Sequence, residues 1–527
     1  DRYLNGTLDD LYDPMLLKDM ERAVSILCEA VDTGKKIRIV GDYDIDGVCS
    51  TYILLQAFER LGSDVDFEIP DRIKDGYGIN ESIIEQAHAD GVEVILTCDN
   101  GISAFHQVEL AKKYGMTVVI TDHHEVPLDG EKEKIPPADA VIDPKQADCP
   151  YPFPEICGAV VAYKLVQVLY ARRGVPRMEW LDLLEFAAIA TVGDVMKLQD
   201  ENRILVKYGL KKMAQTKNLG LRRLAEKNNL DLGAITAYHI GFVIGPCLNA
   251  GGRLKTAKEA LALLRAQSEE EAERLAEELK ELNDTRKDMT EQGTEAAKLQ
   301  VESWYQKDKV LVVFLPECHE SLAGIIAGRL REYYQKPAIV LTRGEEAVKG
   351  SGRSIDEYHM FKKLTEVSDL LLKFGGHPLA AGLSLEEKNI DEFRRRLNEN
   401  AGLTEEDFKA KVWIDVPMPV GYVTERLVRE LSCLEPFGQG NEKPLFAEKS
   451  LRIRASRVLG RNRNVVKMTL EETDGHAIEA LYFGDGTAFE EERAGRREID
   501  VVYYPDINEY NGRKTLQAVI RRYKFRG

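Results

Sequence analysis

GDYDIDG, residues 41–47, places aspartates at alternate positions directly after the apolar run IRIV (37–40) and before an apolar helical segment. Carboxylates packed this closely at the end of a strand repel one another unless cations neutralise them. A structural role would rarely justify that cost. Asp42, Asp44 and Asp46 therefore predict a metal site that acts on a negatively charged substrate.

A calcium-binding loop is the first alternative, because DYDIDG matches the opening of the D-x-D-x-D-G pattern. The twelfth position of such a loop is a bidentate Glu, and here it is Ile53. A strand rather than a helix is also predicted before the motif. Taken alone, the three aspartates leave both a metal site and an acidic turn open.

The region up to about residue 145 alternates short β-rich runs with amphipathic helical segments, which predicts βαβ units and a parallel sheet. The predicted strands are 37–40, 65–69, 92–99, 116–124 and 138–144. Ligands gather at the carboxyl ends of the strands in such sheets. Residues from distant parts of the sequence should therefore meet in one cleft.

Further metal-binding residue types follow the other predicted strands. Asp99 ends one strand, and Asp122, His123 and His124 follow the next. Two adjacent histidines after a buried strand are seldom core residues, because their side chains point to opposite faces and both need partners. Asp194 sits at a turn that ends an apolar helix.

Six of these residues could hold two divalent ions with positions left for water and phosphate. The six are Asp42, Asp44, Asp46, Asp99, His123 and Asp194. Mixed carboxylate and imidazole ligands suit Mn²⁺, our first choice, or Mg²⁺, whereas structural zinc would call for thiolate pairs.

The remaining chain predicts a helical connector, a second α/β unit and a β-rich C-terminal part with strands at period two. The C-terminal strands predict a small barrel of the oligonucleotide-binding (OB) type. We expect four domains: 1–230 catalytic α/β, 231–306 helical connector, 307–411 smaller α/β, and 412–527 OB-like.

Composition sets broad limits on the kind of protein. The chain has 527 residues, 44% of them apolar. Its net charge of −17 argues against a generic basic nucleic-acid coat. Its eight cysteines form no CxxC pair, which favours a reduced cytoplasmic protein. No apolar run approaches the roughly 20 residues of a membrane span, so no membrane partner is expected. The sequence begins at Asp1 rather than Met, which predicts that preceding residues are missing.

Several motifs together resemble a known family. GDYDIDG, CDNG, DHH, ATVGD and GGHPLAAG look like the DHH phosphoesterase superfamily with its associated DHHA1 domain. Within that superfamily, the length, the PCLNAGGR segment and the β-rich C-terminal part are similar to the bacterial single-stranded-DNA-specific 5′-to-3′ exonucleases. The resemblance covers essentially the whole chain.

The resemblance implies roles for individual residues. The six candidate ligands match the family's metal-binding positions, and His124 matches a histidine expected to touch the scissile phosphate. Asp122 is expected to orient the histidines rather than bind metal, and Arg253 is expected to steady the phosphate near the metals.

A second set matches residues that hold the 5′ end of the strand: Ser351, Arg353 and Arg72, with His377 on the same binding surface. Arginine forks and exposed backbone amides are suited to phosphate. Without the family match, GSGRS could be a plain turn and GGHPLAAG tight helix packing. Related sequences usually carry glycine at the position of Ser321, so His319 receives no role.

The sequence therefore predicts a two-metal-dependent 5′-to-3′ exonuclease that degrades single-stranded DNA in repair and recombination. The alternatives are a superfamily phosphodiesterase acting on short RNA oligonucleotides or cyclic dinucleotides, a pyrophosphatase, and a noncatalytic DNA-binding scaffold. By resemblance, a RecQ-type helicase and a single-strand-binding protein are expected partners. A monomer is favoured because the domains already form a cleft.

Overall fold

The computed structural model describes residues 1–72, 76, 78–510 and 513–526 of the chain. Two segments lie partly outside these residues: PDRIKDGYG (70–78), which contains Arg72, and NEYNG (508–512), whose composition is typical of a turn between strands. The chain forms two compact units, each described by itself below. The larger unit comprises 12–194 and 209–410, and the smaller unit comprises 1–11, 195–208 and 411–527.

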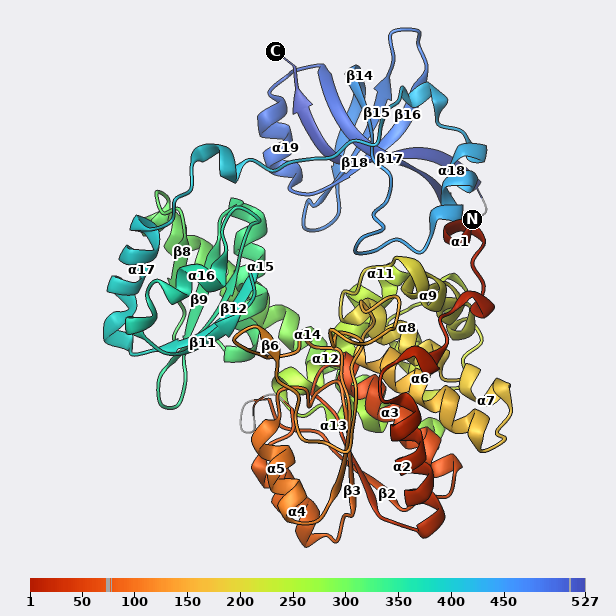
Figure 1. Ribbon diagram of the computed structural model, residues 1–527. Coiled ribbons are helices and arrows are strands. Elements are labelled where there is room, and N and C mark those ends of the chain that lie inside the picture. Colours follow the sequence, from red (N-terminus) through yellow and green to blue (C-terminus); the bar gives the residue numbers. More distant parts are fainter. Residues whose placement is uncertain (73–75, 77, 511–512, 527) are drawn as a thin grey trace. The chain divides into compact units, whose positions relative to one another are not determined.

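The larger unit contains the predicted parallel sheet (Figure 1). Its strand order is β2-β1-β3-β4-β7, and every neighbouring pair is parallel. The strands are β1 (Ile37–Val40), β2 (Val65–Glu68), β3 (Val94–Cys98), β4 (Thr117–Thr121) and β7 (Ala140–Ile142). β1 and β3 are buried along their whole length, because helices cover both faces of the sheet.

Helices cover the two faces of this sheet. On one face, α4 (Glu81–Ala89) and α5 (Phe105–Lys113) pack with the strands in one apolar cluster. On the other face lie α2 (Met20–Thr33), α3 (Ile45–Arg60) and α6 (Gly158–Arg172) (Figure 1). A short hairpin, β5 (Leu128–Asp129) and β6 (Lys132–Glu133), precedes β7.

A helical region links the two α/β parts of the larger unit. It contains α7 (Arg177–Leu181), α8 (Leu184–Gly193), α10 (Leu219–Lys227), α11 (Ala237–His239), α12 (Gly245–Leu254), α13 (Lys258–Leu264) and α14 (Glu269–Gln300). The 32-residue α14 begins at a Ser268 cap, whose side chain accepts a hydrogen bond from the Glu271 amide. In the described part of the chain, no helix combines the length and apolar character needed to cross a bilayer.

One buried acid anchors α8, the helix that leads to Asp194. The Glu185 carboxylate accepts a hydrogen bond from the Thr216 hydroxyl at 2.7 Å. Burial raises the pKa of Glu185 to about 7 from its ordinary value of 4.5. Because the folded protein disfavours the charged form, this group's contribution to stability is complete below pH 4.5 and is lost as the pH rises through 7.

Glu185→Gln should therefore flatten the fall in the free energy of unfolding between acidic and neutral pH, by roughly 3 kcal/mol. Urea unfolding of both proteins across this pH range checks the expectation. An unchanged pH slope would show that Glu185 ionises normally in the folded protein.

The second α/β part of the larger unit has a mixed five-stranded sheet in the order β11-β12-β10-β9-β8. Its strands are β8 (Leu311–Phe314), β9 (Ala338–Arg343), β10 (Val348–Arg353), β11 (Leu371–Gly376) and β12 (Ala380–Leu385). The β8–β9 pair is parallel, and the other pairs are antiparallel. Its helices are α15 (Ala323–Tyr334), α16 (Met360–Thr365) and α17 (Ile390–Glu399).

The smaller unit contains the predicted barrel. Strands β14-β15-β16-β18-β17 pair in that order, and a further β14–β17 pairing closes the ring. They are β14 (Phe446–Leu459), β15 (Val465–Glu471), β16 (Ala477–Phe483), β17 (Glu498–Tyr510) and β18 (Arg513–Phe525), with helices α18 (Glu425–Leu431) and α19 (Gly486–Arg493). The run KVWIDV (411–416) has the alternating apolar residues typical of a strand, but only Val416 is in one, in the short β13 (Val416–Pro417) beside β14.

Residues 195–208 belong to the smaller unit, together with α1 (Arg2–Asn5). They include the first part of α9 (Asp200–Met213). The buried Arg203 guanidinium donates hydrogen bonds to the carbonyls of Tyr3, Cys433 and Leu434. Three segments far apart in the sequence are thus joined by one side chain.

Candidate metal centre

The candidate ligands converge at the carboxyl edge of the parallel sheet. Asp42 follows β1, Asp99 follows β3, and His123 and His124 follow β4. After β1 the chain continues to β2 on one side of the sheet, and after β3 it continues to β4 on the other side, so the strand order reverses between β1 and β3. Ligands of open α/β sheets bind at such a switch point.

The amino termini of two helices hold the remaining motif aspartates. Asp44 caps α3, and its carboxylate accepts hydrogen bonds from the amides of Asp46 and Gly47 at 3.0 and 3.1 Å. The Asp46 carboxylate accepts from the amides of Gly158 and Ala159, both at 2.7 Å, at the start of α6. Helix amino termini present backbone N–H groups that stabilise negative charge, so both carboxylates receive donors from the backbone.

Two glycines allow this close packing of backbone around the acids. A Cβ atom on Gly47 would lie 2.3 Å from the backbone oxygen of Asp42, and one on Gly158 would lie 2.7 Å from the Cβ of Asp99. Asp99 itself has a positive φ of 61°. A non-glycine residue in this conformation often marks a functional site.

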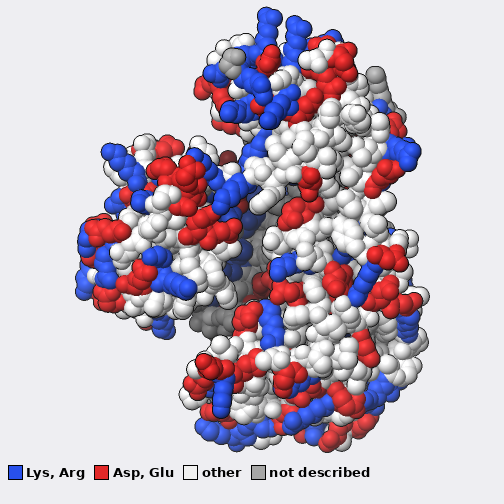
Figure 2. All heavy atoms as spheres, turned by 45° about the horizontal axis from the view of Figure 1, so that its top comes forward, with Lys and Arg blue, Asp and Glu red and all other residues white. Residues whose placement is uncertain are grey.

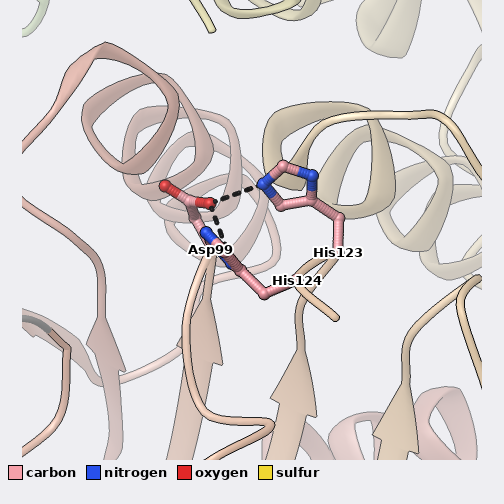
Figure 3. A group of neighbouring side chains, drawn as sticks. All are labelled: Asp99, His123 and His124. Carbon is pink, nitrogen blue, oxygen red and sulfur yellow. Dashed lines mark hydrogen bonds and ion pairs between the residues drawn. The ribbon is translucent and has the colours of Figure 1, made fainter. Parts of the chain in front are cut away.

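His123 lies at the centre of the acidic side chains. Its Nε2 atom is 3.1 Å from Asp99 Oδ1, 3.4 Å from Asp46 Oδ2 and 3.9 Å from Asp194 Oδ2. Figure 3 shows Asp99 and His123 pointing toward each other from neighbouring strand ends. Asp194 follows α8, so this helix adds a ligand from outside the sheet.

The donor atoms form small groups of the size that a cation needs. Asp46, His123 and Asp194 make one group, and Asp42, Asp44 and Asp99 make a second, each with donor atoms within 4.8 Å of one another. Asp99, His123 and His124 form a third, overlapping group. The first two groups together contain the six ligands predicted from the sequence.

Electrostatics supports the fit to divalent cations. Burial and the charges of neighbouring aspartates raise the pKa of Asp42, Asp44 and Asp99, and they raise the pKa of Asp194 to about 8. Burial lowers the pKa of His123, which favours the neutral imidazole that binds metals. Carboxylate and imidazole donors suit Mn²⁺, and carboxylates suit Mg²⁺.

Asp122 contacts backbone and His124 instead of joining the first two groups. Its carboxylate accepts hydrogen bonds from the amides of Ile102, His123 and His124, and from His124 Nδ1 at 2.8 Å. Burial works against ionisation of Asp122, but the His124 hydrogen bond and charge outweigh it and lower the pKa of Asp122. Burial likewise opposes the charged form of His124, yet Asp122 raises the pKa of His124 to about 9.

An arginine-lined cavity of about 750 Å³ adjoins the acidic residues. Arg72, Arg253, Ser351 and Arg353 all line it, as does the first turn of α15. Figure 2 shows the larger unit hollowed between its 307–402 part and the rest of the unit. The cavity thus brings together Arg72, Ser351 and Arg353, which were expected to hold the 5′ end, and Arg253, which was expected to steady the phosphate near the metals.

His377 lies elsewhere. It lines a second cavity of about 560 Å³, together with Asp122, His123 and His124. His377 directly follows β11, and the β11 residues Lys373 and Gly375 still line the first cavity, so the two cavities divide at the end of this strand. The expectation of one surface shared with Ser351 and Arg353 is not met by these cavities.

Several contributing residues were missed at the sequence level. Lys349, Lys373 and Tyr43 line the first cavity. The fully buried Asn100 donates to the carbonyls of Val40 and Cys98, and so fastens the ends of β1 and β3 together. The CDNG motif was the available signal for Asn100, whereas no local pattern marks the two lysines.

Three parts of the chain match known protein families. Its residues 36–191 match the DHH family N-terminal domain, residues 307–402 the DHHA1 domain, and residues 414–522 the RecJ OB domain. The single-stranded-DNA-specific exonuclease RecJ of Bacillus subtilis is 38% identical over 97% of this chain, which spans 64% of that relative's length.

The Escherichia coli protein of the same name is 35% identical over 96% of this chain and 90% of its own length. A crystal structure of RecJ from Thermus thermophilus with Mn²⁺ matches with a TM-score of 0.84 and 29% identity, over 99% of this chain and 73% of that one. These matches confirm the predicted fold class and superfamily. The chain belongs to the RecJ exonuclease family.

Proposed function

We propose that this chain is a divalent-metal-dependent exonuclease that releases 5′-mononucleotides from the 5′ end of single-stranded DNA. One observation carries the proposal: two adjacent three-ligand groups lie beside a cavity lined by arginines. The ligand groups can hold ions that act on a phosphodiester, and the arginine-lined cavity can hold a further phosphate of the same strand. The relatives named above are single-stranded-DNA-specific exonucleases.

Two ions are proposed, either Mn²⁺ or Mg²⁺. Asp46, His123 and Asp194 would hold one, and Asp42, Asp44 and Asp99 the other. Ions bound there would activate a water and stabilise the leaving oxygen in an in-line displacement. Crystal structures of the Thermus relative contain Mn²⁺ in one case and Mg²⁺ in another.

The protein's own groups position the scissile phosphate. His124 is charged at neutral pH through its contact with Asp122, so its imidazolium can donate a hydrogen bond to a phosphate oxygen. Asp122 keeps the ring oriented. Arg253 donates to the Ser321 carbonyl at 3.0 Å, which places its guanidinium at the cavity wall where it can steady the same phosphate.

A terminal phosphate would give the reaction its direction. Arg353 donates hydrogen bonds to the Ser351 hydroxyl and the Gly352 carbonyl, so the two residues form one fixed surface in the cavity. Arg72 stacks over the Tyr43 ring, 4.9 Å from its centre, on the cavity's other wall. A 5′-phosphate held between them would fix the cleavage position one nucleotide away. His377 would contact the strand from the second cavity.

The barrel favours a long polymer over the alternative substrates, short RNA oligonucleotides and cyclic dinucleotides. Outward-facing positions of β14 and the following turn carry exposed Arg452, Arg454, Arg457, Arg461 and Arg463. Figure 2 shows Lys and Arg side chains projecting from the smaller unit. Basic surfaces of OB barrels follow the backbone of unpaired strands.

The cellular setting is also a proposal. By family resemblance, a RecQ-type helicase would supply unwound strands and a single-strand-binding protein would coat them in the cytoplasm. One chain carries every residue proposed for the reaction, so a monomer would suffice.

The decisive experiment offers 5′-labelled and 3′-labelled single strands, duplex DNA and short RNA with Mn²⁺, and follows product sizes over time. We expect the 5′ label to leave first as a mononucleotide, the 3′-labelled strand to shorten gradually, and duplex DNA to persist. Early release of the 3′ label would contradict the polarity. Cleavage of short RNA alone would favour the alternative phosphodiesterase.

A further inference from the structure

A group of arginines in the larger unit lacks acidic partners. Most of the arginines described in this unit pair with carboxylates, as Arg38 does with Asp66 at 2.7 Å. Within the described residues, no carboxylate forms an ion pair with Arg253, Arg286 or Arg329. Arg286 donates to the neutral Asn283 side chain at 3.2 Å. The chain has 89 acidic and 72 basic residues, so acidic partners are plentiful, and yet these three arginines form no ion pair with them in the described part of the chain.

Two helix contacts fix the stretch of α14 that carries Arg286. Asn283 on α14 contacts Cys247 on α12 at 3.4 Å, which fixes the start of this stretch of α14 against α12. Farther along, a Cβ atom on Gly293 would lie 2.6 Å from Ile326, which shows how closely α14 packs on α15 (Figure 1). Arg286 lies between these two contacts.

Arg329 lies on α15, the helix that packs against α14. Ile325 lines the first cavity, and Arg329 is four residues later, on the same face of the helix. Arg329 is exposed, whereas Arg286 is half-buried. The two arginines therefore lie on helices that pack together, and Arg329 is one turn beyond a residue of the cavity wall.

The charges of these residues act on one another. Burial and the charge of Arg329 lower the pKa of Arg286. Burial, followed by the charges of Arg72 and Arg286, lowers the pKa of Arg253 to about 10. The nearby Asp284 is already engaged by Lys280 and Lys287, at 2.7 and 3.2 Å. Like charges held together without a counter-ion are unfavourable, and an anion would relieve the repulsion.

We propose that Arg286 and Arg329 form a second anion subsite, which binds an additional phosphate group of the substrate next to the cavity that holds its 5′ end. Two guanidinium groups offer the paired donors that phosphate oxygens accept. The phosphate would come either from a 5′-polyphosphate end or from the phosphodiester backbone. The subsite rests on the proposed function, since it extends the same substrate path.

Calorimetry tests the subsite without any catalytic step. Metal-free protein is titrated with inorganic phosphate and with tripolyphosphate, as the wild type and as Arg286→Gln and Arg329→Gln. We expect the wild type to bind tripolyphosphate more tightly, and each variant to lose about tenfold or more of that affinity, because a charge-assisted hydrogen bond contributes roughly 1.5 to 3 kcal/mol. Arg274→Gln is the matched control, since Arg274 lies on the same helix but pairs with Glu278.

Strand binding then identifies the source of the phosphate. Single strands with a 5′-hydroxyl, 5′-monophosphate or 5′-triphosphate are bound at several salt concentrations. A loss confined to the triphosphate strand in the two variants identifies a polyphosphate end. A loss for all strands, with the salt slope smaller by about 0.7, identifies a backbone phosphate.

Unchanged binding of both tripolyphosphate and strands in folded variants would overturn the subsite. An equal loss in Arg274→Gln would do the same, because it would reduce the effect to general charge. Failure of the proposed function looks different: the wild type would then not degrade single-stranded DNA with Mn²⁺, whatever it binds in calorimetry.

Discussion

Asp44→Asn is expected to slow hydrolysis of single-stranded DNA about 100-fold or more while the protein stays folded. A metal ion supplies several kcal/mol of transition-state stabilisation, and each 1.4 kcal/mol or so is tenfold in rate. Asparagine is as good an N-cap as aspartate, so α3 should keep its two capping hydrogen bonds. Initial rates on a 5′-labelled single strand with Mn²⁺ measure the effect.

Asp485→Asn is the matched control. Asp485 caps α19 in the smaller unit and accepts from two backbone amides, at 2.8 and 3.0 Å, as Asp44 does in α3. Its replacement should leave the rate unchanged. If Asp44→Asn retained most of the activity, Asp44 would not be a metal ligand.

Thermal unfolding separates loss of metal from loss of fold. Burial and the charge of Asp46 raise the pKa of Asp44, so the ionised carboxylate destabilises the metal-free protein at neutral pH. Metal-free Asp44→Asn should therefore melt at a higher temperature than the wild type. Added Mn²⁺ should raise the melting temperature of the wild type more than that of the variant, because a ligand stabilises a protein in proportion to its affinity for the folded state.

The sequence predicted those features that local patterns encode. Apolar runs such as 94–98 and 117–121 predicted buried parallel strands, and the polar residues directly after them predicted the edge at which ligands meet. Asp99 and His123 lie 24 residues apart, yet a parallel sheet brings their side chains within 3.1 Å. For this reason the candidate ligands could be predicted from the sequence.

Features that depend on long-range packing were not predicted. Nothing around Asp46 indicates that its carboxylate receives the start of α6, 112 residues later. Likewise, Arg203 reads as part of a helical catalytic domain, but its hydrogen bonds join it to residues 3, 433 and 434 in the smaller unit. Periodicity reports which face of an element is buried, and it carries no information about which distant backbone groups that face meets.

Arg353→Ala is expected to weaken binding of 5′-phosphorylated single strands about 10- to 100-fold, with little effect on strands that carry a 5′-hydroxyl. Arg353 is half-buried, and burial lowers the pKa of its guanidinium, so a phosphate would receive a strong contact that solvent screens only in part. Hydrolysis of a small phosphodiester should be unaffected, because that substrate has no terminal phosphate. Arg343→Ala is the control, since Arg343 on β9 is exposed and pairs with Glu387.

Arg353→Lys and Gly324→Ala distinguish charge from geometry at this position. Lysine keeps the positive charge but loses the planar fork, so a phosphate bound through two parallel hydrogen bonds should recover only part of its affinity. A Cβ atom on Gly324 would lie 2.8 Å from Arg353 Nη2 and 2.9 Å from Ser351 Oγ, so alanine should displace both groups without changing any charge. Loss of the 5′-phosphate preference in Gly324→Ala would therefore assign that preference to the shape of the cavity. Equal losses for phosphorylated and hydroxyl ends in all three variants would instead assign these residues to general strand binding.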